Sequence, residues 1–108
     1  MEKNKNDVEA LVSSNGISIA IGDRVVNGTK MNFTNGLARI SAKNTSSNAV
    51  MGVHIVDVAG FDEPVKEWFL QPGQSLNQSN IKVKKDYLYL RLTSYSQNAT
   101  GHATLTKL

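Results

Sequence analysis

Three Asn-Gly pairs, at positions 15–16, 27–28 and 35–36, are the feature that most constrains the fold of this chain. Two-residue hairpin turns need positive φ angles, which Asn and Gly tolerate, and their twist matches that of the flanking strands. A Gly22-Asp23 pair carries the same signal between the first two. The short segments separated by these pairs therefore predict a meander of antiparallel β-strands.

Alternation of apolar and polar residues identifies the strands. The clearest strand is Tyr87–Tyr95, in which Leu88, Leu90 and Leu92 would face the core while the tyrosines face the other way. Ile17, Ile19 and Ile21 show the same period near the N-terminus. Further strands are predicted over Arg24–Val26, Thr29–Thr34, Leu37–Lys43, Ala49–Ala59, Val65–Leu70, Ser75–Val83 and His102–Leu108, with Met31, Phe33, Ala38, Ile40, Ala42, Ala103 and Leu105 pointing inward.

Several irregularities interrupt this pattern. The alternation slips between Ile55 and Val58, which predicts a β-bulge near Val56 or Asp57 in a central strand. The segment 71–74 has Pro and Gly at the positions that favour a type II turn. The strand 75–83 breaks near 78–80 and could consist of two shorter pieces.

The chain is predicted to be an all-β antiparallel sandwich of about seven to nine short strands, Ig-like or jelly-roll-like. A length of 108 residues suits one such domain, assigned here to residues 15–108. Residues 1–14 are expected to be a flexible N-terminal segment, in which 7–13 would form a short helix or, nearly as well, a short strand. Strands do not alternate with helical patterns, which excludes a doubly wound nucleotide-binding fold.

Composition and charge disfavour several functions. The sequence has no Cys, so disulfides and thiolate chemistry are absent. The net charge of +3 comes mainly from Lys, and the one tight cluster (Lys82, Lys84 and Lys85) is followed by Asp86, so no nucleic-acid partner is expected. No apolar run reaches the roughly 18 residues of a membrane-spanning helix.

Catalytic and metal-binding groups are sparse. The two histidines, His54 and His102, do not assemble into a triad with any recognisable nucleophile, and His54 is expected to bond a backbone group or hydroxyl. We expect no enzymatic activity, no cofactor and no metal site. Asp57, Asp62 and Glu63 could bind calcium, but they lack the usual alternation with Asn and Gly, and an ordinary acidic loop is the preferred interpretation.

The candidate ligand-binding residues lie on the outward side of the last two predicted strands. They are Tyr87, Tyr89, Arg91 and Tyr95, joined by His102 if the two strands form a hairpin. Tyrosine combines an apolar ring with a polar tip, which suits contact with a sugar or a protein. Aromatic residues also favour strands for purely structural reasons, and the N-terminal segment could cover this face. Trp68 is interpreted as a core anchor in preference to a ligand platform.

These observations favour a non-enzymatic binding module that presents a Tyr-rich sheet face or loops to a glycan or protein partner. One alternative is a self-assembling structural, surface or virion subunit that associates through its edge strands. Another is a small membrane-binding or pore-forming β protein, whose tyrosines and lysines would meet lipid headgroups. We expect a secreted or cell-surface location, as a mature form, in preference to the cytoplasm.

Overall fold

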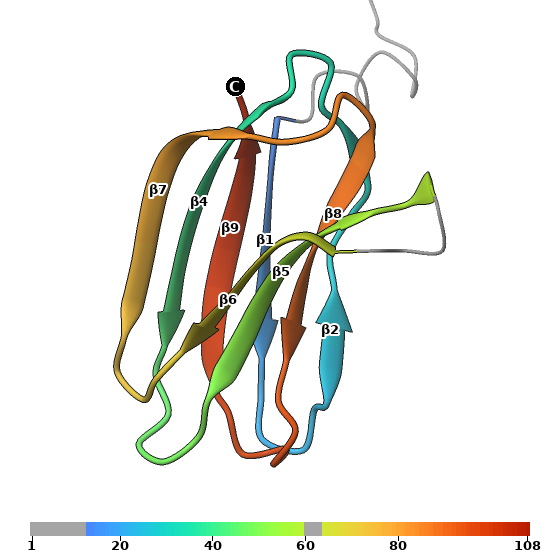
Figure 1. The fold of residues 1–108 in the computed structure, drawn as a ribbon. Coiled ribbons are helices and arrows are strands. Elements are labelled where there is room, and N and C mark those ends of the chain that lie inside the picture. Colours follow the sequence, from blue (N-terminus) through green and yellow to red (C-terminus); the bar gives the residue numbers. More distant parts are fainter. Residues whose placement is uncertain (1–12, 60–63) are drawn as a thin grey trace, which may run out of the picture.

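Nine β-strands in two antiparallel sheets make up the computed structural model, which describes residues 13–59 and 64–108 (Figure 1). The strands are β1 (Ser14–Ile19), β2 (Val25–Asn27), β3 (Met31–Asn32), β4 (Leu37–Asn44), β5 (Met51–Asp57), β6 (Pro64–Leu70), β7 (Ser75–Lys82), β8 (Tyr87–Thr93) and β9 (Gly101–Lys107). The predicted antiparallel β-sandwich is confirmed. Across 13–59 and 64–108, no helix is long and apolar enough to span a bilayer.

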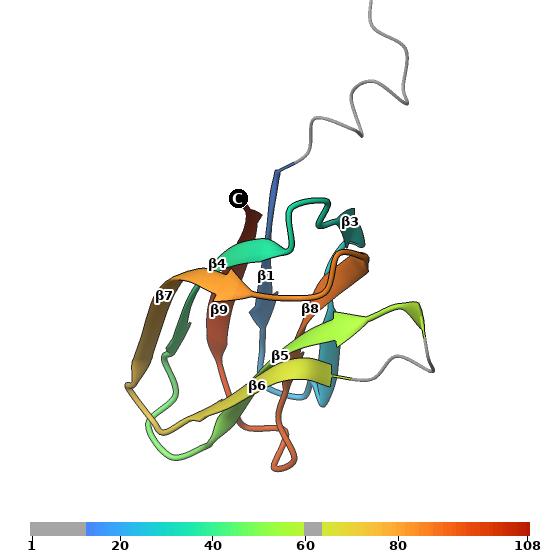
Figure 2. The same cartoon turned by 45° about the horizontal axis from the view of Figure 1, so that its top comes forward.

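The order of the strands identifies the sandwich as a jelly roll. The first sheet has the order β1-β9-β4-β7, and the second has β2-β8-β5-β6, with β3 also paired to β8. The chain is therefore one long hairpin wound on itself. Its nested pairs, β1 with β9, β2 and β3 with β8, β4 with β7, and β5 with β6, fall alternately in the two sheets (Figure 2). This winding is characteristic of jelly rolls.

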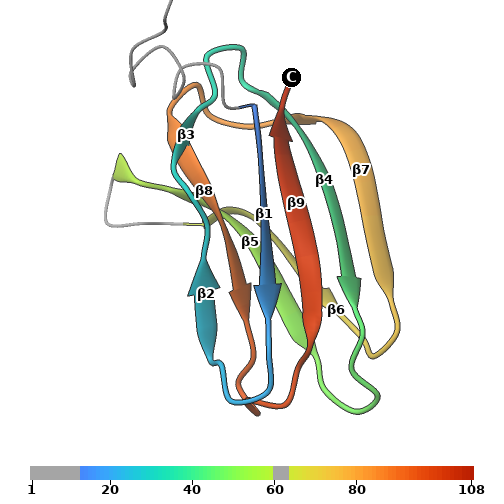
Figure 3. The same cartoon turned by 180° about the vertical axis from the view of Figure 1, so that it is seen from behind.

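The predicted meander is wrong, because among the strands of the described residues β5 and β6 are the only consecutive ones that pair with each other. Two of the Asn-Gly pairs make no turn: Asn15-Gly16 lies inside β1, and Asn27-Gly28 lies where β2 gives way to β3. Asn15 Oδ1 instead accepts a hydrogen bond of 2.9 Å from the backbone N–H of Thr29. A Cβ on Gly28 would overlap Asn15 Oδ1, so this glycine allows the edges of the two sheets to approach (Figure 3).

Other predicted turns are confirmed. Gly22, Gly36 and Gly73 have φ angles of 98°, 64° and 78°, which explains why glycine occupies each position. The N–H of Gln74 donates to the carbonyl of Gln71 at 2.9 Å, which closes the Pro-Gly turn. The turn at Gly36 joins β3 to β4 in the opposite sheet and is therefore not a hairpin.

The core lies between the sheets and contains the side chains that the alternation placed there. Leu88, Leu90 and Leu92 of β8 are fully buried. Trp68 is half-buried and packs against this core, which confirms its predicted role as a core anchor. Ile21 is an exception: it lies beyond the end of β1 and is 72% exposed. Other buried core residues include Ile19, Met31, Phe33, Ala38, Ile40, Met51, Val53, Ile55, Leu70 and Leu105.

Two strand irregularities occur where the sequence pattern breaks. The pairing of β5 with β6 shifts between Ile55 and Val56, and the extra residue, Val65, belongs to β6. The pairing of β4 with β7 shifts opposite the predicted break, where Asn80 has a φ of 55°. The predicted helical turns at 7–13 fall outside the described residues, apart from residue 13.

Candidate functional site

The structure separates the residues predicted to form one binding face. β8 belongs to the second sheet and β9 to the first, because segment 94–100 crosses between the sheets. The predicted hairpin of these two strands is therefore wrong. His102 is exposed on the outer face of the first sheet, where it lies between Ser18 and Lys43 on the neighbouring strands. It does not join the tyrosines.

The three tyrosines occupy different environments along the second sheet. Tyr87 is 53% exposed at the start of β8, whereas Tyr95 is 84% exposed just beyond its end. Tyr89, between them, is buried. Arg91 lies over the ring of Tyr89 and donates a hydrogen bond from Nη2 to the tyrosine hydroxyl, and its Nε donates to Asn27 Oδ1. Tyr95 is thus the most exposed of the three tyrosines.

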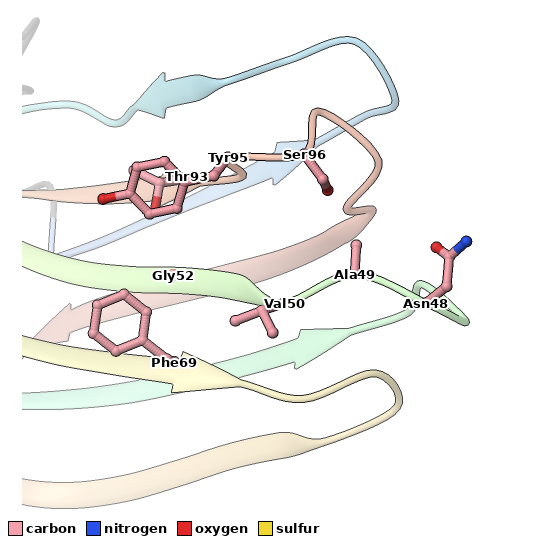
Figure 4. Close-up of a pocket in the computed structure, with 8 residues that line it drawn as sticks. All are labelled: Asn48, Ala49, Val50, Gly52, Phe69, Thr93, Tyr95 and Ser96. Atoms are coloured by element: carbon pink, nitrogen blue, oxygen red, sulfur yellow. The ribbon is translucent and has the colours of Figure 1, made fainter.

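A shallow pocket of about 240 Å³ lies beside Tyr95 on the outer face of the second sheet. Gly52 of β5 forms its floor, opposite Thr93 of β8 on one side and Phe69 of β6 on the other. The rings of Tyr95 and Phe69 flank Gly52 (Figure 4). The lining residues are Asn48, Ala49, Val50, Gly52, Phe69, Thr93, Tyr95 and Ser96, none of which carries a charge. We call this site the Gly52 pocket.

The side chains next to Gly52 require glycine at this position of the pocket floor. A Cβ on Gly52 would overlap Thr93 Oγ1 and would lie only 2.6 Å from His54 Nε2. A glycine inside a strand weakens it, and one cause of its presence is the close approach of another group. Gly52 therefore gives room to the side chains of Thr93 and His54, which approach its backbone between the two rings.

A hydrogen-bonded chain of three side chains reaches the pocket through Thr93, the one member of the chain that lines it. His54 Nδ1 lies 2.6 Å from Glu67 Oε2, and His54 Nε2 lies 2.8 Å from Thr93 Oγ1. His54 is buried, and its ring packs edge-on against Phe69 at 5.8 Å between centroids. The hydroxyl partner predicted for His54 is confirmed, and the carboxylate partner is an addition from the structure.

Buried hydrogen bonds hold the loops that border the pocket. Asn44 is fully buried; its Nδ2 donates to the carbonyls of Ala49 and Leu70, and its Oδ1 accepts from Ser46. The N–H of Gly22 donates to the carbonyl of Gln97 at 2.8 Å, which joins two further loops. These bonds hold the backbone of the loops that contain several of the pocket residues.

This end of the sandwich is nearly free of charge. The strand registers bring four loops together here, and Asp23 and Arg24 are the only charged residues in them. Ile21, Val25 and Val50 add exposed apolar side chains beside Phe69 and Tyr95. The four loops are 20–24, 45–50, 71–74 and 94–100.

The opposite end carries the lysine cluster. Lys84 pairs with the buried Asp57 at 3.1 Å. Burial raises the pKa of Asp57, but hydrogen bonds from Lys84 and the Ala59 N–H, with the charge of Lys84, outweigh it and hold this pKa below its ordinary value. An open groove of about 410 Å³ beside this pair is lined by Pro64, Val65, Lys66, Lys82, Val83 and Lys84.

The residues considered for calcium do not form a site in the described structure. Asp57 is engaged by Lys84, and Asp62 and Glu63 lie outside the described residues. Among residues 13–59 and 64–108, no group of three or more His, Asp or Glu side chains could hold a metal ion.

Comparison with known proteins bears on the fold. No family model and no curated protein matches the sequence. Among solved structures, PirA is similar, with a TM-score of 0.57 and 11% identity over 88% of this chain and 93% of PirA. A Yersinia pseudotuberculosis-derived mitogen has a TM-score of 0.46 at 11% identity, covering 89% of this chain and 85% of the mitogen. A chain from the disulfide-linked pili of Bacillus endospore appendages has a TM-score of 0.42 at 10% identity, covering 88% and 87%.

The likeness to PirA supports the all-β fold alone. Jelly rolls occur both in lectin domains and in capsid subunits, so the fold suits a binding module or a structural module. A choice between these classes depends on the surface of this chain.

Sequence reasoning missed most of the Gly52 pocket. Phe69 is not among the residues predicted for the binding face, yet it is 54% exposed and lines the pocket. The signals were the glycine within an otherwise apolar strand and the alternation of Trp68 with Glu67 and Phe69. Neither signal shows which strands are neighbours, so the pocket appears only in the folded chain.

Proposed function

We propose that this chain is a non-enzymatic binding module that recognises an uncharged partner through the Gly52 pocket and the neutral loops around it. The observation that carries the proposal is the gathering of exposed Phe69 and Tyr95 around a glycine floor. Solvent-exposed aromatic and apolar side chains grouped in one patch mark interaction sites. The predicted glycan and protein partners both remain within this proposal.

The surrounding loops support the same function. Their composition of Ser, Asn, Gln and Tyr resembles that of antibody binding loops, in which Tyr supplies rigid contact area and the small polar residues supply hydrogen bonds. The buried bonds of Asn44 hold one of these loops in a fixed conformation. A preformed surface lowers the entropic cost of binding.

The two alternative functions receive less support from the surface. Assembly through edge strands is disfavoured because β6 and β7, two of the four edge strands, carry bulges and lysines, which discourage pairing between sheets. The other two edges, at β1 and β2, lie against each other, where the N–H of Thr29 donates to Asn15. Membrane binding by tyrosines and lysines together is disfavoured because the most exposed tyrosine, Tyr95, lies beyond the end of β8 that is remote from the lysines, and of the three tyrosines only Tyr87 lies at the lysine end.

The proposal is tested by screening the full chain against a glycan array and a random phage-displayed peptide library in parallel. The double variant Phe69→Ala/Tyr95→Ala removes both rings from exposed positions and should leave the fold intact. Ligands selected by the wild-type chain should lose at least about tenfold in affinity for this variant, because large aromatic contacts contribute most at interfaces.

Tyr87→Ala is the matched control. It removes an aromatic side chain of similar exposure from the same strand, at the end remote from the pocket. We expect it to bind like the wild type. Equal binding by the double variant, loss of binding in Tyr87→Ala alone, or the absence of a ligand in both screens would each overturn the proposal.

A further inference from the structure

The Gly52 pocket has features that define one chemical class of ligand. It combines the rings of Phe69 and Tyr95 with the polar side chain of Thr93, and Gly52 contributes no side chain between the two rings (Figure 4). We infer that the pocket is a subsite for a single neutral pyranose ring, which donates a hydroxyl hydrogen bond to Thr93. This inference rests on the proposed function and names the ligand class of that same site.

The hydrogen-bonding direction follows from the chain of three side chains. An ionised Glu67 can only accept, so His54 Nδ1 carries the proton and donates to it. When the imidazole of His54 is neutral, its Nε2 carries no proton and therefore accepts from the Thr93 hydroxyl. The hydroxyl proton of Thr93 is thereby engaged, and its remaining capacity toward the pocket is that of an acceptor. A ligand beside Thr93 must therefore supply a donor.

The other residues of the pocket determine which further chemical features the ligand must have besides a hydrogen-bond donor. The exposed rings of Phe69 and Tyr95 favour an apolar face, and the C–H face of a pyranose provides one next to its hydroxyl groups. The lining has no charged residue to compensate for the desolvation of a charged ligand. A neutral sugar meets all three conditions.

The size of the pocket limits the ligand to one ring. Its volume of about 240 Å³ lies below the roughly 300–1,000 Å³ of pockets for drug-sized ligands. A longer glycan would therefore place one residue in the pocket and extend over the neutral loops. Free methyl glycosides should bind with a Kd of about a millimolar, as expected for such small ligands.

The inference is tested by titrating the ¹⁵N-labelled full chain with methyl glycosides of glucose, galactose, mannose and N-acetylglucosamine. At least one should shift the amide resonances of Gly52, Thr93 and Tyr95, whereas those of Tyr87 and His102 should stay unchanged. Thr93→Val removes the acceptor and keeps the branched shape, and it should weaken binding about tenfold. Thr93→Ser restores the hydroxyl and should bind within about twofold of the wild type.

The outcomes separate this inference from the proposed function. Unchanged affinity in Thr93→Val, shifts that map elsewhere, or no shifts with any glycoside would overturn the sugar subsite. If peptides but no sugars bind, and the Phe69→Ala/Tyr95→Ala variant loses them, the pocket takes a peptide side chain and the proposed function stands. If that variant retains every ligand, both the sugar subsite and the proposed function are overturned.

Discussion

The guanidinium of Arg91 lies 5.5 Å from the centroid of the Tyr89 ring and donates a hydrogen bond to the hydroxyl of the same residue. Tyr89 is consequently 5% exposed although it points away from the core. Tyr89 and Arg91, which were both predicted to contact a ligand, thus contact each other. The exposed aromatic rings near the pocket are those of Tyr95 and Phe69, and Tyr89 is not among them.

Replacing Arg91 should uncover Tyr89. We expect Arg91→Ala to lower the free energy of unfolding by about 1 kcal/mol, because a cation–π contact and the hydrogen bonds to Tyr89 and Asn27 are lost. Urea unfolding monitored by tyrosine fluorescence measures this change. Tyr89→Phe, which keeps the ring and loses only the hydroxyl, should cost less. Equal stability of Arg91→Ala and wild type would contradict the structural role assigned to this pair.

A methyl group at Gly52 should damage both the sheet and the pocket. We expect Gly52→Ala to destabilise the chain by about 1–3 kcal/mol, as overpacking typically does, because Thr93 Oγ1 and His54 Nε2 must move. Thermal unfolding gives the stability, and the His54 side-chain resonances report the lost hydrogen bond. Gly73→Ala is a useful contrast: no atom lies within 4 Å of its added Cβ, and its cost comes only from a φ of 78°. Unperturbed His54 resonances in Gly52→Ala would be inconsistent with this geometry.

Asn44 should be important for stability despite being polar. Asn44→Ala removes the donor to two buried carbonyls, those of Ala49 and Leu70, and we expect a loss of about 2–4 kcal/mol. Chemical denaturation provides the measurement. The exposed Asn98, in another loop at the same end, is the control, and its replacement by Ala should change stability by less than about 0.5 kcal/mol. Similar effects of the two substitutions would refute the role of the buried network.

The Asp57–Lys84 pair predicts a pH dependence of stability. Because the pKa of Asp57 is lower in the folded chain than in the unfolded chain, its contribution is fully present above the unfolded value of about 4. The contribution is lost as the pH falls through the folded pKa. Unfolding curves between pH 2 and 7, about the range spanned by carboxyl titration, should therefore show a shallower acid loss for Asp57→Asn than for wild type. Lys84→Met should also reduce the dependence, and an unchanged acid profile in both variants would exclude the pair as its source.

The sequence predicted the positions of the strands better than it predicted which strands pair with each other. Each apolar alternation, such as that of Leu88, Leu90 and Leu92, reports which face of a strand is buried, and this is a local property. Pairing is not local in a jelly roll: β8 and β9 follow each other in the chain yet lie in opposite sheets. For that reason the predicted site wrongly included His102. Tyr95, which was also predicted, does line the pocket.

The Asn-Gly pairs show how a strong local signal can mislead. Asn35-Gly36 forms the predicted turn, but Asn15 and Gly28 meet each other across the sandwich edge. Glycine serves there as a place without a side chain, and Asn serves as a hydrogen-bond acceptor for Thr29. Both uses depend on the tertiary structure, so local turn preference could not reveal them.

The nested pairing of the strands also has a kinetic consequence. Ser14 of β1 pairs with Thr106 of β9, whereas β5 and β6 are consecutive, and loop-closure entropy penalises the distant pair most. We expect folding to begin at the β5–β6 hairpin, spread outward and be slow for a chain of this size. Pulse-labelled hydrogen exchange should protect amides of β5 and β6 before those of β1 and β9. Gly52, His54, Glu67 and Phe69 all lie on that first hairpin. The glycine floor and one of the two rings of the pocket would thus form early, and β8 with the segment after it would add Thr93 and Tyr95.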